Sequence, residues 1–81
     1  MTWLVLIYTV PRSPSRKRAF VWRELKKIGA VYLRDGVCTL PDRNDTRRAM
    51  QASAATVREY DGRAIVIEDA QLDAETAASV V

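Results

Sequence analysis

Apolar residues fall into two patterns that predict different elements. Residues 3–10 (WLVLIYTV) form a near-continuous apolar run that ends at Pro11, as expected for a strand buried on both faces. In residues 14–28, Val21, Leu25 and Ile28 are spaced as on one face of a helix, with Trp22 beside them. We therefore expect a strand followed by a helix, with Trp22 packed in the core.

The rest of the chain continues the alternation of strands and helices. Residues 30–33 and 37–40 are short strand candidates joined by Asp35-Gly36, a strong hairpin signal. A helix over 46–60 follows, with the thin apolar face Met50, Ala54 and Val57, and then a strand over 63–67. The order β-α-β-β-α-β predicts an α+β, ferredoxin-like fold, an antiparallel sheet with two helices on one face. The loop before the second helix offers the capping residues Asp42, Asn44 and Asp45.

The composition changes near the end of the chain. We assign residues 1–69 to the ferredoxin-like domain, and residues 70–81 to a linker or the start of a helix that leads to a missing C-terminal domain. Asp73 is placed to cap that helix, with Glu75 in its first turn.

Two helices can cover only one face of the sheet, which leaves an apolar face in need of a partner. We predict a homodimer and assign its interface to Leu4, Leu6 and Tyr8, which share one face of the first strand. The alternative interface is the opposite face, with Val5 and Ile7, and the alternation itself does not choose between the two.

The start of the first helix carries Arg12, Arg16, Lys17 and Arg18, in a chain of 81 residues with a net charge of +3. Ser13 suits the N-cap, and Pro14 suits the first helical position. Cations at a helix start oppose the helix dipole, so this cluster predicts a site for nucleic-acid phosphate or another oxyanion. The alternative is a solvated basic turn that contacts nothing.

Other chemistry has little support in the sequence. The chain has no histidine, and its single cysteine, Cys38, is expected to be a buried apolar residue, which favours a cytoplasmic protein without disulfides. No apolar run is long enough to span a membrane. Asp35 is interpreted as a turn residue, and Glu68-Asp69 has no recognisable partner for holding a cation. We predict no catalytic residues, no metal site and no cofactor.

Several segments together resemble one family. They are Trp3-Leu4-Val5-Leu6, Arg18, Val21-Trp22-Arg23, Leu25, Gly29-Ala30, Leu33-Arg34-Asp35-Gly36-Val37 and Leu40-Pro41. Over residues 2–72 the chain resembles the N-terminal domain of the ChrB family of chromate-resistance regulators. The layout is also similar to the central domain of PaaX-type repressors and to small ferredoxin-like CRISPR-associated endonucleases.

The resemblance to ChrB implies a regulatory and dimerisation module of a longer bacterial protein that controls a chromate-efflux operon. DNA would be a partner, and chromate would act through the full-length protein. The first alternative is a stand-alone metal-dependent nuclease. The nuclease relatives hold their metal with an aspartate at the end of strand one, where this chain has Thr9, and a hydroxyl does not replace a carboxylate there. The second alternative is chromate binding at the start of the first helix.

Overall fold

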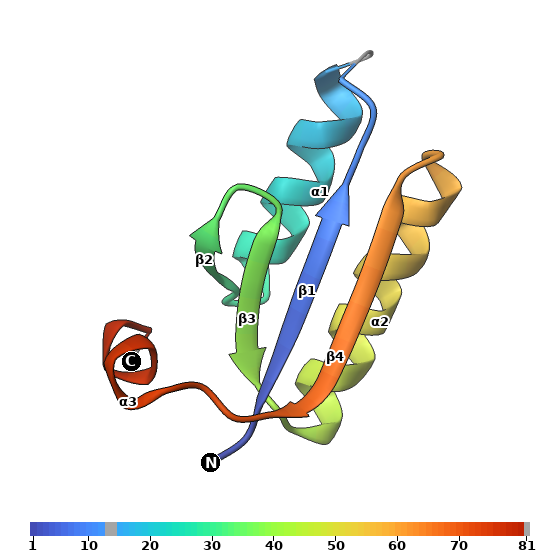
Figure 1. The fold of residues 1–81 in the computed structure, drawn as a ribbon. Coiled ribbons are helices and arrows are strands. Elements are labelled where there is room, and N and C mark those ends of the chain that lie inside the picture. The colour runs from blue at the N-terminus through green and yellow to red at the C-terminus, as the bar shows by residue number, and fades with distance from the viewer. Residues whose placement is uncertain (13–14, 81) are drawn as a thin grey trace.

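The computed structural model describes residues 1–12 and 15–80, which form a β-α-β-β-α-β unit followed by a short helix (Figure 1). The elements are β1 (Trp3–Thr9), α1 (Ser15–Lys27), β2 (Val31–Arg34), β3 (Val37–Pro41), α2 (Asn44–Glu59), β4 (Arg63–Ala70) and α3 (Ala74–Ser79). This order confirms the predicted α+β, ferredoxin-like fold. The expected helix-start residues Ser13 and Pro14 lie outside the described residues, as does Val81.

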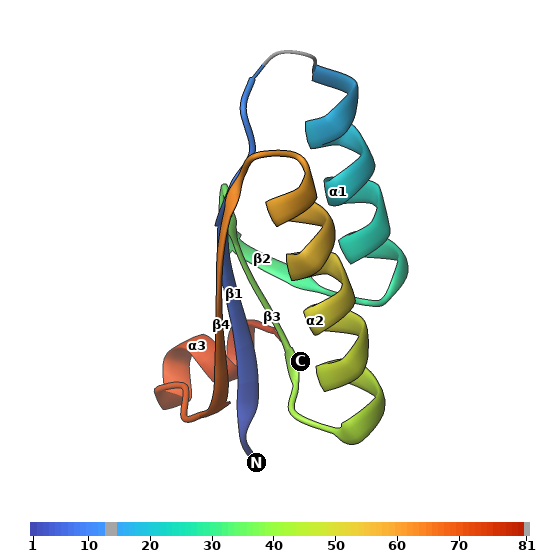
Figure 2. The ribbon, with the colours of Figure 1, turned by 90° about the vertical axis from the view of Figure 1, so that its right-hand side faces the viewer.

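The described strands form one antiparallel sheet in the order β2-β3-β1-β4. Helices α1 and α2 cover one face of this sheet, whereas α3 lies on the opposite side (Figure 2). We call the face away from α1 and α2 the open sheet face. Because β1 is flanked by β3 and β4, its backbone is paired along both edges, as its apolar sequence predicts.

Alternation along β1 divides its side chains between the two faces. Leu6 pairs with Cys38 on the helix-covered face, and both side chains are fully buried. Ile7 pairs with Ile65 of β4 on the open sheet face, where 38% and 57% of these residues are exposed. The expectation that β1 is buried on both faces is therefore wrong for the open face, because α1 and α2 cover only the other one.

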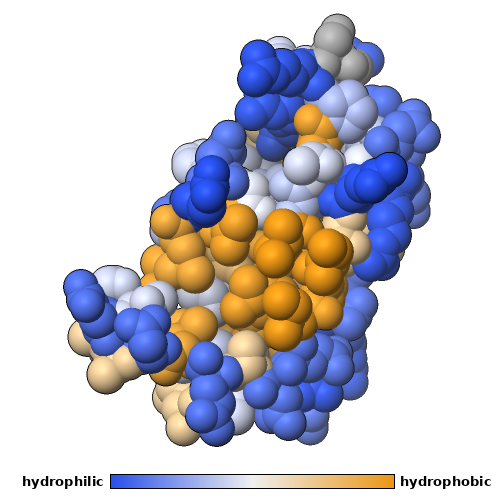
Figure 3. All heavy atoms as spheres, in the orientation of Figure 1, coloured by the Kyte–Doolittle hydropathy of each residue, from blue (hydrophilic) through white to orange (hydrophobic). Residues whose placement is uncertain are grey.

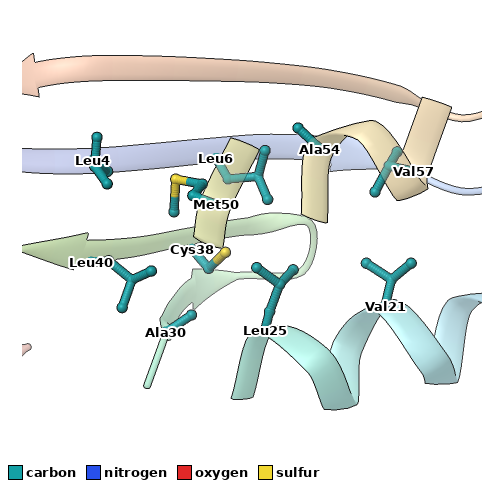
Figure 4. Close-up of a cluster of buried hydrophobic side chains, with 10 residues drawn as sticks. All are labelled: Leu4, Leu6, Val21, Leu25, Ala30, Cys38, Leu40, Met50, Ala54 and Val57. Carbon is teal, nitrogen blue, oxygen red and sulfur yellow. The ribbon is translucent and has the colours of Figure 1, made fainter. Parts of the chain in front are cut away.

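The core lies between the helix-covered face and the two helices (Figure 4). Leu4 and Leu6 of β1 meet Leu25 of α1 and Met50 of α2, and all four are fully buried. The spacing that predicted the apolar faces of both helices is confirmed by the buried set, which consists of Leu4, Leu6, Val21, Leu25, Ala30, Cys38, Leu40, Met50, Ala54 and Val57.

Two glycines let turns approach the end of β1 closely. Gly36 has a φ of 79°, and its carbonyl accepts a hydrogen bond of 2.8 Å from the N–H of Tyr8. At Gly62 a Cβ atom would overlap the carbonyl oxygen of Thr9 and would lie only 2.8 Å from Cγ1 of Val57. Both turns can therefore pack closely against the end of β1 because glycine has no side chain.

Helix α2 begins two residues earlier than predicted, at Asn44. The hydroxyl of Thr46 accepts a hydrogen bond of 3.0 Å from the N–H of Arg43, which satisfies this donor at the helix start. The expected caps Asn44 and Asp45 consequently lie inside the helix, and Asp42 precedes it with its carboxylate engaged elsewhere.

The C-terminal segment contains the helix that the sequence suggested. Strand β4 continues to Ala70, beyond the predicted end, and α3 follows. The carboxylate of Asp73 accepts a hydrogen bond of 3.3 Å from the N–H of Thr76, and Glu75 lies in the first turn, which confirms the predicted cap. The division into a domain over 1–69 and a connecting segment over 70–81 stays a prediction.

Candidate anion-binding surface and cleft

Helix α1 concentrates the positive charge of the chain. It carries six basic residues and one acidic residue, a net charge of +5, whereas the whole chain has a net charge of +3. Its first turn contains no acidic residue. Val21 and Leu25 anchor one face of the helix in the core, so the charged side chains occupy the remaining faces. The helix is thus the main source of positive potential in the fold.

The predicted cluster does not form a single site, because Arg12 precedes α1 and the other members lie on different faces of that helix. Arg16 and Lys17 line a shallow depression beside the end of α2, whereas Arg12 and Arg18 line a cleft beside the end of β1. Successive helical residues are rotated by about 100°, which directs residues 16 and 18 to opposite sides of the helix. The structure therefore places two cationic regions where the sequence suggested one.

The first region, which we call the α1 basic surface, consists of Arg16, Lys17, Phe20, Arg23 and Tyr60 and encloses about 420 Å³. The ring of Phe20 packs edge-on against Tyr60, with 6.3 Å between centroids, and the ammonium of Lys17 lies 5.1 Å from the centroid of Tyr60. Among the residues that the structure describes, no carboxylate lies within 4.0 Å of the three cations. They are therefore available to an external anion.

The second region, which we call the β1–α1 cleft, is an open cavity of about 710 Å³. The hairpin between β2 and β3 closes its far side. Trp22 stands in its wall with 50% of the residue exposed, so the expectation that Trp22 packs in the core is wrong. The cleft is lined by Tyr8, Thr9, Val10, Arg12, Ser15, Arg18, Ala19, Trp22, Asp35 and Gly36.

A pair of tyrosines fixes the floor of this cleft. The hydroxyls of Tyr8 and Tyr32 are joined by a hydrogen bond of 2.5 Å, and their rings meet edge-on with 6.4 Å between centroids. Burial raises the pKa of Tyr32 well above its usual range, and the hydrogen bond with Tyr8 raises it further. Both hydroxyls therefore stay protonated at neutral pH, and the floor is uncharged.

The residues predicted for a dimer interface require a correction. Leu4 and Leu6 are 0% exposed and lie under the helices, and Tyr8 is half-buried on the same side. A partner cannot reach Leu4 or Leu6 in this fold. The accessible apolar surface is the open sheet face with Ile7 and Ile65, where apolar side chains gather across the middle of the sheet (Figure 3).

Two of the carboxylates singled out in the sequence, Asp42 and Glu68, have structural partners. Arg47 forms a bidentate ion pair with Asp42 at 2.8 Å and reaches Glu68 at 3.5 Å. Asp42 also accepts a hydrogen bond of 2.7 Å from the N–H of Asp69, so this network ties the start of α2 to β4. Sequence spacing gave no sign of it, because its members lie as far apart as residues 42 and 69.

Metal and thiol chemistry have no site in the part of the chain that is described. Within residues 1–12 and 15–80, no group of three or more acidic or cysteine side chains is arranged to hold a metal ion. Cys38 is buried, as predicted, and burial raises the pKa of its thiol to about 12. Within the same residues, the helices lack the length and apolar character needed to cross a membrane.

Comparison with known proteins identifies the family. The family model described as "Protein ChrB, N-terminal" matches residues 18–81. The chain belongs to this family. The resemblance used in the sequence analysis is thereby confirmed.

A curated relative gives the scale of the match. Protein ChrB of Cupriavidus metallidurans is 38% identical over 61 residues, which are 75% of this chain and 19% of that protein. The matched segment thus spans about a fifth of the relative's length. No solved structure matches the chain. The match over 18–81 includes Arg18, Trp22 and Asp35 of the β1–α1 cleft, whereas Arg12 precedes it.

Proposed function

We propose that this chain is the N-terminal regulatory module of a chromate-responsive transcriptional regulator, and that it helps to bind DNA through the α1 basic surface. The observation that carries this proposal is the net charge of +5 on one exposed helix. Arg16 and Arg23 are exposed and Lys17 is half-buried, and no carboxylate among the described residues neutralises them. Several cations without a carboxylate partner on one side of a helix suit contact with successive phosphates.

Local stability gives a second argument. Cations in the first turn of a helix oppose its dipole, at a cost of about 0.3–1 kcal/mol each. Arg16 and Lys17 both occupy this turn of α1, and no acidic residue accompanies them. A cluster held against local stability is consistent with selection for an anionic partner.

Salt dependence of DNA binding tests the proposal. The variant Arg16→Ala/Lys17→Ala should bind every duplex more weakly, and the slope of log affinity against log salt should shrink by up to about two. Its melting temperature should stay the same or rise, because cations leave the helix start. As a control, Arg34→Ala/Arg48→Ala removes the same charge from exposed positions outside α1 and should leave the slope unchanged. If Arg16→Ala/Lys17→Ala melts at a higher temperature and binds DNA as tightly as the wild type, the cluster is only a solvated turn that does not contact DNA.

We also propose that the module forms a homodimer through the open sheet face. Val5, Ile7, Ile65 and Ile67 lie on this face, and three of them keep between 38% and 57% of their surface. The molecule measures 37 by 23 Å in its two longest directions. A standard interface takes roughly 800 Å² from each partner. Under two-fold symmetry, the apolar patch of one copy would meet the same patch of a second copy.

The two proposed surfaces are compatible. The α1 basic surface belongs to the helical layer, whereas the open sheet face is on the other side of the sheet (Figure 2). Dimerisation would therefore leave α1 of each copy free to meet DNA.

We assign no catalytic step to the module. Thr9 stands at the end of β1, where the nuclease relatives carry a metal-binding aspartate, and a hydroxyl is a poor substitute for a carboxylate towards Mg²⁺. Incubation of DNA and RNA with the protein and Mg²⁺ or Mn²⁺ should give no cleavage. Cleavage that disappears in Asp35→Ala or Glu68→Ala would instead support the nuclease alternative.

A further inference from the structure

The β1–α1 cleft has the size and construction of a small-molecule site. Its volume of about 710 Å³ is within the usual range of ligand pockets, roughly 300–1,000 Å³. Its floor is rigid, because Tyr8 is hydrogen-bonded through its hydroxyl to Tyr32 and through its N–H to Gly36. The duplex-binding proposal uses the opposite side of α1 and leaves this cleft without a role.

Two guanidinium groups approach the cleft from different segments. Arg12 follows β1, and Arg18 belongs to the first half of α1. Both are exposed, and among the described residues neither has a carboxylate within 4.0 Å. Guanidinium groups bind phosphate through paired hydrogen bonds, so the pair provides a recognition element for a phosphoryl group.

An exposed aromatic ring lies beside these cations. Trp22 is on the same face of α1 as Arg18, one turn further along, and half of it is exposed. Its neighbour Val21 is buried, so the core-facing position of this turn is filled by valine and the indole is left to the cleft. The ammonium of Lys26 lies over one face of the indole, 5.8 Å from the Trp22 centroid, so the other face is the one offered to a base. An indole face in a cationic cleft is a stacking platform for a nucleobase.

Asp35 completes the lining from the hairpin. Its carboxylate is exposed, and it forms no ion pair with Arg12 or Arg18 at the distances found in the structure. A carboxylate accepts hydrogen bonds from a sugar hydroxyl or an exocyclic amine, whereas it repels a phosphate. The cavity thus carries cationic groups and, more than 4.0 Å from their nitrogens, a hydrogen-bond-accepting carboxylate, as a ligand with an anionic end and a polar end requires.

We propose that the β1–α1 cleft binds a nucleotide, with the base stacked on Trp22 and the phosphate held by Arg12 and Arg18. The chemistry is the same for a free mononucleotide and for an unstacked nucleotide within a single strand, and the experiment separates these sources. The inference does not depend on duplex binding by Arg16 and Lys17, because those residues lie on the other side of α1.

The experiment uses the protein with the probes AMP, GMP, adenosine, inorganic phosphate and an octathymidylate. Binding is followed by tryptophan fluorescence, since Trp22 is exposed and the only other tryptophan, Trp3, is buried and serves as a constant background. We expect quenching by at least one mononucleotide and weaker binding of adenosine and phosphate. Arg18→Ala should weaken nucleotide binding about tenfold or more, as expected for the loss of charge-assisted hydrogen bonds. Trp22→Ala should do the same when binding is measured by calorimetry.

The matched control is Arg16→Ala/Lys17→Ala, which should leave nucleotide affinity within about twofold because screening weakens the influence of distant exposed charges. If the oligonucleotide binds more tightly than AMP, and Arg18→Ala weakens both equally, the natural ligand is a nucleotide within a single strand. If AMP binds more tightly, the natural ligand is a free nucleotide. If phosphate binds as well as AMP, and Trp22→Ala has no effect, the cleft is an oxyanion site and the proposal is wrong. Absence of binding by all probes also overturns it, whatever the result with duplex DNA.

Discussion

Replacing Ile65 by lysine tests the open sheet face most directly. Ile65 lies on the edge strand β4, opposite Ile7 of β1, and 57% of it is exposed. In a dimer formed through this face, the side chain would be covered by the partner. In the monomer it contributes little to the core, so the substitution separates association from folding.

The exposed fraction sets the magnitude. Full burial of an isoleucine is worth about 1.5–3 kcal/mol, so covering the remaining 57% of Ile65 contributes about 0.9–1.7 kcal/mol per copy. A two-fold dimer contains this contact twice, which gives about 1.7–3.4 kcal/mol for the pair. At about 1.4 kcal/mol for each factor of ten, Ile65→Lys should raise the dimer dissociation constant about 20- to 300-fold. An unpaired ammonium in an apolar interface adds to this loss.

The assay is sedimentation equilibrium of the wild type and the variant over the same concentration series, with urea unfolding at low concentration beside it. Ala55→Lys adds the same charge to an exposed position on α2 and should leave the dissociation constant unchanged. The stability of monomeric Ile65→Lys should fall by no more than about 1 kcal/mol, the span of strand propensities. A wild type that stays monomeric at its highest soluble concentration refutes the dimer. If the Ile65→Lys variant dimerises as tightly as the wild type, the open sheet face is not the interface. If this face is protected from solvent only in a longer protein, another domain covers it instead of a second copy.

Other predictions concern the fold and its titrating groups. Gly62→Ala should destabilise the protein by about 1–3 kcal/mol or more in urea unfolding, because the new Cβ would overlap the carbonyl oxygen of Thr9; an unchanged midpoint would show that this turn is not fixed. Cys38 should not react with a thiol reagent in the native state and should react after unfolding. Because burial raises the pKa of its thiol to about 12, the free energy of unfolding should fall as the pH rises from the usual thiol pKa towards 12. This fall should be smaller in Cys38→Ala. The Arg47 guanidinium lowers the pKa of Asp42, so the pair stabilises the fold at neutral pH and is lost as the pH falls through that lowered pKa. Asp42→Asn should therefore lower the melting temperature near neutrality and make little difference in strong acid; an equal loss at both pH values would contradict this account.

Predictions from the sequence succeeded where a pattern depends on near neighbours. The helix spacing of Val21 and Leu25 fixed which face of α1 enters the core, and Asp35-Gly36 fixed the hairpin, because both depend on local backbone geometry. The same spacing did not predict Trp22 correctly. Val21 takes the core-facing position of that turn, and Trp22, rotated by about 100° from it, lies outside the core.

The candidate site shows the same division. The sequence located every cation of the cluster, but only the orientation of α1 assigned Arg16 and Lys17 to one surface and Arg18 to the cleft. The pairing of β2 with β3 brings Asp35 to the cleft at the end of β1 and places Tyr32 where its hydroxyl bonds to that of Tyr8.

For this protein, the sequence by itself determined the order of elements, the ferredoxin-like topology, the family and the positive charge of α1. The order of elements, the topology and the charge follow from periodicity, turn chemistry and composition, which are properties of short segments, whereas the family came from the resemblance of particular segments to a known family. Only the tertiary structure decided which face of β1 is open. A strand that is apolar on both sides carries no mark of the face that the helices will cover, and that choice follows from the handedness of the crossovers that place α1 and α2. The fold thereby buried Leu4 and Leu6 and left Ile7 and Ile65 exposed.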